Sequence, residues 1–449
     1  MSARGVAAGL RWSYTSACLA ALAACATFSD TIQSTERGLA QQQPRAALAE
    51  YEKLKPGPAD RVLYLMNKGM LLRMSGDYEE STRSLEEAKQ LIENLRALSL
   101  REQALSFTVN DATKAFIGED FERVMVNAYL ALNYLEQGRL DDARVEALQV
   151  DVLLRDKGQK TTIVKPYEED AFARYLTGII YEDEGEWSDA MISYRQAYEA
   201  YEKQQKAFEV EMPQSLKHDL IRLADRVGLT DEVKKYREEF DIKKTMSEAD
   251  LLQLGEVILT VHAGLAPIKR EHATTVPNPA TGRILRIALP QYKSRAQPLS
   301  YATLAAEASP PVKTSRVENI QAIAEKTLDA EMPLITARAI ARMAAKDTFA
   351  AVAGNSGSND SGGAALLGLL VNVAAVATER ADTRSWFTLP GEIYLLRLPL
   401  PPGEHTLKLE LHSREGHLIN SSEIKVTLRK GEKKYFSRHW IPSTLEIRP

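Results

Sequence analysis

The residues of this chain that could carry out chemistry are few, and their spacing does not match common catalytic motifs. Seven histidines are present, and none lies in the HExxH arrangement that binds zinc. No serine occupies the GxSxG turn of the α/β hydrolases, and Gly354-Asn355-Ser356-Gly357 lacks the GK[ST] residues of a phosphate-binding loop. His412 and His417 flank a turn, but a metal bound there would need further ligands. We therefore expect no enzymatic activity, no catalytic residues, no metal and no cofactor.

The remaining reactive side chain is a cysteine near the start of the chain. Arg4 and Arg11 are followed by an uncharged apolar run, Ser13–Ala24, which ends at Cys25. A positive start, a short apolar run and small residues in this order indicate a secretory signal. The run is too short to span a hydrocarbon core about 30 Å thick. The only other cysteine, Cys18, would be removed with the signal, so no disulfide can form within the exported chain.

The four residues that end this signal, Leu22-Ala23-Ala24-Cys25, resemble the lipobox of bacterial lipoproteins. The resemblance implies that residues 1–24 are removed and that Cys25 becomes a diacylated and N-acylated first residue. Three acyl chains such as palmitate, at about 0.8 kcal/mol per buried methylene, would form a stable membrane anchor. The alternative is an ordinary signal peptide that is cleaved near Ala24. Because Ala26 and Thr27 follow the cysteine and no aspartate follows it directly, the lipoprotein sorting pattern implies the periplasmic face of the outer membrane.

Composition limits what the rest of the chain can be. The 449 residues carry a formal net charge of −4, without the basic stripe of a nucleic-acid-binding protein. A hydrophobic fraction of 44% is ordinary for folded domains. We expect a tether over residues 25–36, a helical repeat domain over residues 37–245 and a β-rich domain over residues 250–449. The membrane would be contacted through the acyl chains, and no nucleic acid partner is expected.

Residues 37–245 have the periodicity and the pattern of small and large residues that tetratricopeptide-like repeats show. In the clearest copy, small residues stand where two helices would approach, aromatic residues stand beside them, and Gly185 is at the turn. Its signature residues are Gly178, Tyr181, Gly185, Trp187, Ala190, Tyr194 and Ala197. Weaker copies begin at Gly69 and Ala131, 62 and 47 residues before the next copy. Tandem repeats of this kind are about 34 residues long, so we expect additional helices between the copies.

The first helix of each repeat lines the concave face of such domains, and here that face is apolar. The residues that map to it are Leu63, Met66, Met70, Met74, Met125, Leu132, Leu135, Phe172, Tyr175 and Ile179. Methionine adapts to varied partners, so one hypothesis is an open groove for a partner's helix or extended peptide. The alternative is that inserted helices fill this face and the methionines belong to the core. The acidic run Glu182-Asp183-Glu184, with Glu186, is interpreted as a solvated helix end.

Residues 250–449 change to a strand pattern. Glu256–Val261 and Arg283–Leu289 are rich in β-branched residues, and three prolines between them predict a long loop. Glu392–Leu398 and Thr406–Leu411 alternate, as strands do when one face packs on a core. The fold class that we expect is therefore α+β multidomain, with an all-α tetratricopeptide-like N-terminal part and an antiparallel β-sandwich-like C-terminal domain.

An alanine-rich helical insert, at about residues 316–379, is expected to interrupt the β-rich domain. Arg316–Ala353 predicts two helices, with Pro333 near the start of the second. Ala364–Ala377 is an apolar run that Asn372 interrupts. Such a helix could insert shallowly into a membrane or pack on a partner, because its small residues allow close approach. The alternative is a helix buried against the sheet.

One stretch resembles a protein family. Glu379–Trp386, followed by Thr388-Leu389-Pro390 and Leu400-Pro401-Pro402-Gly403, is similar to an uncharacterised group of proteobacterial lipoproteins that have a tetratricopeptide-like N-terminal half and a β-rich C-terminal domain. The lipobox and the order of the domains agree with that group. The resemblance implies location and architecture and assigns no activity. Asp382 and Arg384, beside Trp386, predict an ion pair that pins the end of the insert to the sheet; the alternative is a ligand site.

These observations predict an outer-membrane-anchored periplasmic lipoprotein that acts as a protein–protein interaction scaffold in a cell-envelope or surface-export assembly. A second hypothesis is an oligomeric structural subunit of an envelope complex, whose copies associate through the alanine-rich and apolar helices. A third is a hydrolase of cell-wall glycan, which a cleft with paired carboxylates of perturbed pKa would support.

Overall fold

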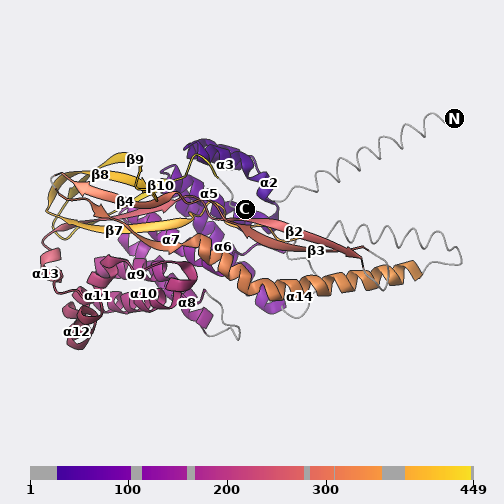
Figure 1. Cartoon of the computed structure of the whole chain (residues 1–449), viewed down its shortest axis with the longest axis horizontal. Helices are drawn as coiled ribbons and strands as arrows, with labels where there is room; N and C mark the ends of the chain where they lie inside the picture. Colours follow the sequence, from indigo (N-terminus) through magenta and orange to yellow (C-terminus); the bar gives the residue numbers. More distant parts are fainter. Residues whose placement is uncertain are drawn as a thin grey trace.

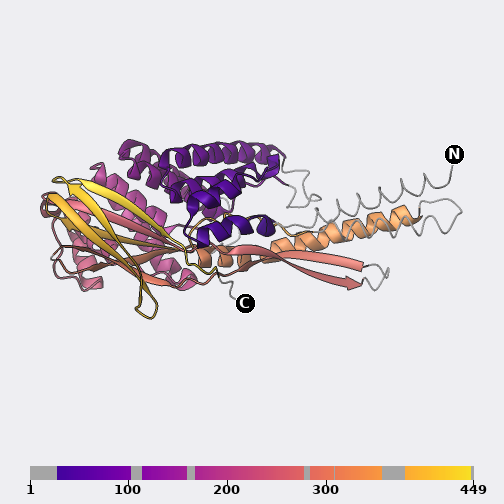
Figure 2. The ribbon, with the colours of Figure 1, turned by 90° about the horizontal axis from the view of Figure 1, so that it is seen from above.

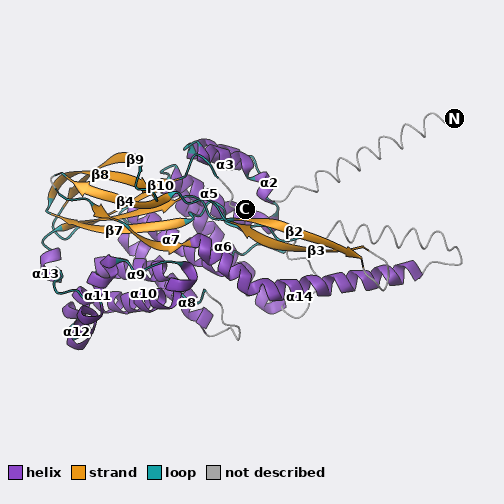
Figure 3. Ribbon diagram, viewed as in Figure 1, coloured by secondary structure: helices purple, strands orange, loops and turns teal. Residues whose placement is uncertain are grey.

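The computed structural model of the chain describes residues 28–102, 114–158, 167–277, 284–307, 309–355 and 380–445. These residues form a series of helical hairpins that curves around one side of a β-sandwich, and an arm that projects from it (Figures 1 and 3). The fold class is α+β, with an all-α N-terminal half and a C-terminal half that combines mostly antiparallel strand pairs with the long helix of the arm.

The N-terminal half begins with three short helices, α2 (Phe28–Thr31), α3 (Gln33–Ala40) and α4 (Pro44–Tyr51), and a 3-10 turn, η1 (Pro58–Asp60). Helical hairpins follow: α5 (Arg61–Met74) with α6 (Tyr78–Glu102), α7 (Asp120–Glu136) with α8 (Leu140–Gly158), α9 (Ala171–Asp183) with α10 (Trp187–Phe208), and α11 (Gln214–Arg226) with α12 (Thr230–Glu239). Each of these hairpins turns at a glycine with positive φ, which other residues rarely adopt: Gly76, Gly138, Gly185 and Gly228.

After α13 (Glu248–Leu251), the strands form two four-stranded sheets and one hairpin. The inner sheet has the order β10 (Lys433–Trp440), β1 (Gly255–Ala263), β7 (Glu392–Leu400), β6 (Ser315–Asn319). The outer sheet has the order β5 (Val312–Lys313), β4 (Leu299–Ala306), β8 (Gly403–Ser413), β9 (Leu418–Leu428). The hairpin joins β2 (Ile268–Pro277) to β3 (Ile284–Lys293). One pair departs from the expected antiparallel arrangement, because β1 and β10 are parallel, with Glu256 opposite Lys433.

The inner sheet is buried on both faces. One face packs on the outer sheet, where Val257 and Leu259 belong to the same apolar core as Leu304 and Leu407. The other face packs on the helices, where Ile258 belongs to the core of the helical hairpins. All nine residues of β1 are therefore buried, although antiparallel sheets commonly leave one face in water.

Three expectations about the C-terminal half are wrong. Where a long loop was expected before residue 283, β2 forms, because the polar residues after Ile268 alternate across a strand that pairs with β3. Where two helices were expected, one helix of 36 residues forms, α14 (Ile320–Asn355), with Pro333 inside it. Helix-forming residues, many of them alanine, surround this exposed proline and favour a continuous helix. The insert also starts later than expected, because residues 316–319 belong to β6.

The arm consists of the β2–β3 hairpin and α14, which packs on β3 and extends beyond the sandwich (Figure 2). At 1.5 Å per residue, α14 is about 54 Å long. Within the described ranges, no helix combines the length and the apolarity that a membrane span requires. The apolar run Ala364–Ala377 and the lipobox residues Leu22, Ala23, Ala24 and Cys25 lie outside the described residues.

Candidate functional site

The repeat signature residues come together where α9 and α10 pack. A β-carbon at Gly178 would lie 2.3 Å from Cδ1 of Tyr194, so only glycine fits against this ring. Ala190 and Ala197 are fully buried, and Gly185 makes the turn. In the first copy, Gly69 packs in the same way against Leu85. The spacing of small and aromatic residues thus marks the close approach of two helices.

Of the two hypotheses for the residues of the apolar face, the structure excludes the open groove and confirms that the methionines belong to the core. Met74 is half-buried, and the other nine are buried in the core: Leu63, Met66, Met70, Met125, Leu132, Leu135, Phe172, Tyr175 and Ile179. The element that covers this face is the inner sheet, and not inserted helices. Tyr129 of α7 and His262 of β1 are joined by a hydrogen bond of 3.0 Å, and the hydroxyl of Tyr201 in α10 donates to the carbonyl of Val317 in β6. The concave face is filled because the C-terminal half folds into it.

A cluster of buried charges joins the helices to the inner sheet. Arg397 of β7 donates to Glu182 of α9 at 2.6 Å, to Asp219 of α11 at 2.8 Å and to Glu256 of β1 at 2.7 Å. Arg222 of α11 donates to the same Glu182 at 2.6 Å. The side chains of these five residues are less than a tenth exposed. The interpretation of the acidic run as a solvated helix end is therefore wrong for Glu182, because the sheet supplies its cationic partners.

Glu182 and Arg397, at the centre of the charge cluster, stay ionised. Burial alone would raise the pKa of Glu182, but Arg222 and Arg397 hold it well below the usual range of a carboxyl group. Burial by itself would lower the pKa of Arg397, but Asp219 and Glu182 raise it well above its ordinary value. Groups that do not change protonation near neutral pH are poor acids and bases. We interpret the cluster as a set of buried ion pairs that holds the two halves together.

The expected ion pair between Asp382 and Arg384 is present, but it joins the segment to the helical half and not to the sheet. Arg384 donates to Asp382 Oδ2 at 2.7 Å and to Asp60 Oδ1 at 3.0 Å, which ties this segment to the turn before α5. Trp386 is fully buried, and its backbone N–H donates to Glu122 of α7 at 2.7 Å. This contact is a second polar tie between the helices and the C-terminal half.

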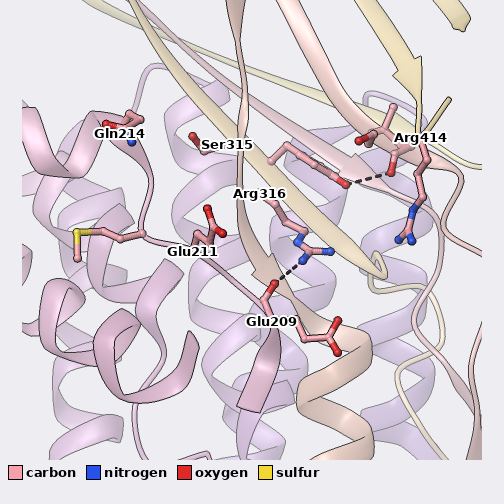
Figure 4. A pocket seen from close by; sticks show the side chains of 10 residues that line it. Glu209, Glu211, Gln214, Ser315, Arg316 and Arg414 are labelled. Carbon is pink, nitrogen blue, oxygen red and sulfur yellow. Dashed lines mark hydrogen bonds between the residues drawn. The ribbon is translucent and has the colours of Figure 1, made fainter. Parts of the chain in front are cut away.

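A polar pocket of about 530 Å³ opens where the α10–α11 loop meets the strands (Figure 4). This volume lies within the range of small-molecule sites. Its lining comes from the loop, from β4, β6 and β7, and from the β8–β9 turn, and it includes Glu209, Glu211, Gln214, Ser315, Arg316, Tyr394 and Arg414. None of these residues was expected as a site residue, because the fold brings together segments that are far apart in the sequence.

Two guanidinium groups stand on two sides of this pocket (Figure 4). Arg316 is committed to protein partners, since it donates to Glu392 Oε1 at 2.6 Å and to the backbone carbonyl of Glu209. Arg414 is exposed and forms no ion pair within the described ranges. Glu209 and Glu211 are also exposed. A ligand with a carboxylate beside an amine or amide would meet complementary charges here, and Arg414 has the planar fork for a bidentate pair.

The floor of the polar pocket is held in one protonation state. The hydroxyl of Tyr394 donates to Glu392 Oε2 at 2.7 Å, which leaves the other oxygen for Arg316. Burial and the neighbouring Glu392 raise the pKa of Tyr394 above its ordinary value, so the phenol keeps its proton. Arg316 is the one residue of this pocket that the sequence analysis names, as the start of an expected helix. The structure places it on strand β6 instead.

The structure brings some titratable groups together, but without the access that catalysis needs. Glu318 of β6 is hydrogen-bonded to Asp170, and burial, followed by Asp170, raises its pKa well above the usual range. Both residues are buried, and neither lines the polar pocket. His262 and His439 stack with ring centroids 4.5 Å apart, and burial lowers the pKa of both. Within the described part of the chain, no group of three or more acidic, histidine or cysteine side chains could hold a metal.

Comparison with known proteins adds little to this geometry. No protein-family model and no curated protein matches the chain. Among solved structures it is similar to apo RapI, at 10% identity over 47% of this chain and 51% of RapI, with a TM-score of 0.35. It is also similar to MamA (16% identity, 47% of this chain, 97% of MamA, TM-score 0.29) and to Pseudomonas aeruginosa PilF (18%, 46%, 73%, 0.30). The chain thus spans about half the length of RapI, and each similarity covers less than half of this chain.

Proposed function

We propose that this protein is an outer-membrane-anchored periplasmic lipoprotein that acts as a protein–protein interaction scaffold in an envelope assembly. We also propose that it belongs to the uncharacterised proteobacterial lipoprotein group that its C-terminal half resembles. The lipobox that ends at Cys25 supports the anchor, and the residues after it support the outer-membrane address. The order of the helical and β-rich halves supports the family.

The observation that carries the scaffold proposal is the polar pocket at the junction of the two halves. The concave face, where tetratricopeptide-like domains would bind a partner, is filled by the inner sheet. The polar pocket is open, includes unlike charges, and is held by residues of both halves. A peptide segment of a partner protein, with its carboxylate on Arg414 and an amide or amine on Glu209 or Glu211, fits this chemistry.

The test compares two exposed arginines in turns of the same sheets. A photo-crosslinking residue at Gln214 captures the partner in intact cells, and Arg414→Glu removes the capture while Arg429→Glu keeps it. Arg429 is the matched control because it is exposed in the β9–β10 turn, outside the polar pocket. Equal capture by both variants, or capture of nothing at Gln214, would refute docking at this site. Cys25→Ala should separately release the protein from membranes, and its retention there would refute the lipid anchor.

A second candidate function, an oligomeric structural subunit, is favoured by one side of α14. Leu334 and Ile340 are each 47% exposed, although they are large and apolar. Between Ala330 and Ala344, Arg338 is the one exposed charged residue. Light scattering of the detergent-solubilised protein distinguishes the candidates. A defined oligomer that Leu334→Ser and Ile340→Ser together convert to monomer supports a structural subunit, and a monomer in both proteins refutes it.

A further inference from the structure

A second cavity, which we call the apolar cavity, lies between the first helices and the segment before β7. Its volume is about 370 Å³, and its walls come from α2, from the turn between α4 and α5, and from the segment before β7. The residues that the argument uses are Phe28, Tyr51, Leu54, Tyr64, Asp60 and Arg384. Unlike the polar pocket, it has a mainly aromatic and aliphatic wall.

The wall of the apolar cavity is ordered by ring contacts. Tyr51 and Tyr64 stack with ring centroids 5.2 Å apart and an interplanar angle of 14°. Phe387 lies behind them, 6.1 Å from Tyr51 and 6.2 Å from Phe28 between centroids. Packed rings of this kind leave little freedom for the wall to collapse, so the space persists and favours an apolar occupant.

Three of the charged residues that line the apolar cavity are paired with one another. Arg384 donates to Asp60 at 3.0 Å and to Asp382 at 2.7 Å. Glu271, which also lines the cavity, is paired with Arg286, and Lys55 is exposed. An uncharged hydrocarbon chain would leave these pairs intact and needs no counter-ion, so it suits the aromatic and aliphatic part of the wall.

The position of the apolar cavity in the chain identifies the source of that alkyl chain. Phe28, which lines the cavity, is the third residue after Cys25. Three residues span at most about 11 Å. The next residue, Ser29, is buried, and its hydroxyl donates to the carbonyl of Lys269 at 2.6 Å, which holds α2 at the base of the arm. Chain length therefore places any group attached to Cys25 within about 11 Å of Phe28 in the cavity wall.

We propose that the apolar cavity receives one of the acyl chains carried by Cys25. This inference rests on the proposed lipidation and goes beyond it, since it gives the anchor a binding site in its own protein. Withdrawal of one chain leaves fewer chains in the bilayer, and it fixes the orientation of the arm relative to the membrane surface. A lipoprotein built in this way holds the membrane less tightly than its acyl chains together would allow.

The experiment supplies cells with a fatty acid that carries a photoreactive diazirine near its end and purifies the full lipoprotein after irradiation. A crosslink that joins the Cys25 peptide to peptides containing Leu54 or Tyr64 is the expected result. Leu54→Glu should abolish this crosslink, because a carboxylate in the wall excludes an alkyl chain. Leu252→Glu is the matched control, since Leu252 is also half-buried and does not line the apolar cavity, and it should keep the crosslink.

Three outcomes overturn the inference in distinguishable ways. Label on Cys25 with crosslinks to phospholipid alone shows that every acyl chain lies in the bilayer. Crosslinks at Leu54 that persist at the same yield in Cys25→Ser show that the occupant is a free lipid. Absence of any label on the Cys25 peptide refutes the lipidation itself, and with it the proposed anchor.

Discussion

The charge cluster yields the sharpest prediction, for the variant Arg397→Leu. In the native protein the guanidinium of Arg397 contacts three carboxylates from three different elements. After its removal, Glu182 and Asp219 keep Arg222, but Glu256 has no other ion-pair partner within the described ranges. An uncompensated buried charge costs about 3–5 kcal/mol. We expect the free energy of unfolding to fall by this amount.

The assay is urea unfolding of the full chain, followed by circular dichroism for the helices and by tryptophan fluorescence, to which the buried Trp386 contributes. Arg195→Leu is the control, because it breaks a half-exposed pair with Glu232 at 2.7 Å, and such pairs are worth about 0.2–1 kcal/mol. Adding Glu256→Gln to Arg397→Leu should recover part of the loss, since it removes the orphaned charge. A loss of stability no larger than that of the control, or no recovery in the double variant, would refute the role of the charge cluster in holding the two halves together.

Three further predictions concern single side chains. Burial raises the pKa of Glu122 to about 7 from an ordinary value of 4.5, so the native protein retains a proton that the unfolded chain releases. The free energy of unfolding should therefore fall by about 3 kcal/mol as the pH rises from about 4.5 to 7. Urea titrations at these two pH values should show that Glu122→Gln removes this pH-dependent loss of stability. Gly178→Ala should lower the unfolding free energy by about 1–3 kcal/mol in thermal melts, because a ring occupies the space, whereas Gly57→Ala, with nothing within 4 Å, should change little. Met70→Asp should abolish the folded circular dichroism spectrum and the exposed control Met246→Asp should keep it; a folded Met70→Asp protein would mean that the concave face is accessible.

Local features of the chain were predictable from the sequence. The glycine and aromatic residues of the α9–α10 hairpin predict its turn and its close contact, because both depend on residues within one helical turn or one hairpin. The clean alternation of Thr406–Leu411 likewise predicts β8, one of whose faces packs on the core. The prolines that frame β2 predict a loop and so mask the alternation of that strand, and Pro333 predicts a boundary although the helix continues through it.

Neither cavity could be predicted from sequence spacing. The polar pocket combines Glu209, Arg316 and Arg414, which come from a helix end, an edge strand and a turn. Their signals are single charged residues, and most single charged residues on a chain are simply solvated. The apolar cavity likewise depends on the return of residues 380–384 to the helices before α5.

Which faces of the helices are apolar, where the hairpins turn, and where an acyl anchor is expected all follow from neighbouring residues, so the amino-acid sequence specifies them directly. That the methionine-lined face is core follows only from the contacts between the two halves. Periodicity shows that Met66 and Met70 avoid water, but a partner peptide and a sheet of the same chain satisfy that requirement equally well. The inner sheet covers this face because β1 pairs in parallel with β10 and because Arg397 forms ion pairs with α9 and α11. These contacts join residues that lie more than a hundred positions apart.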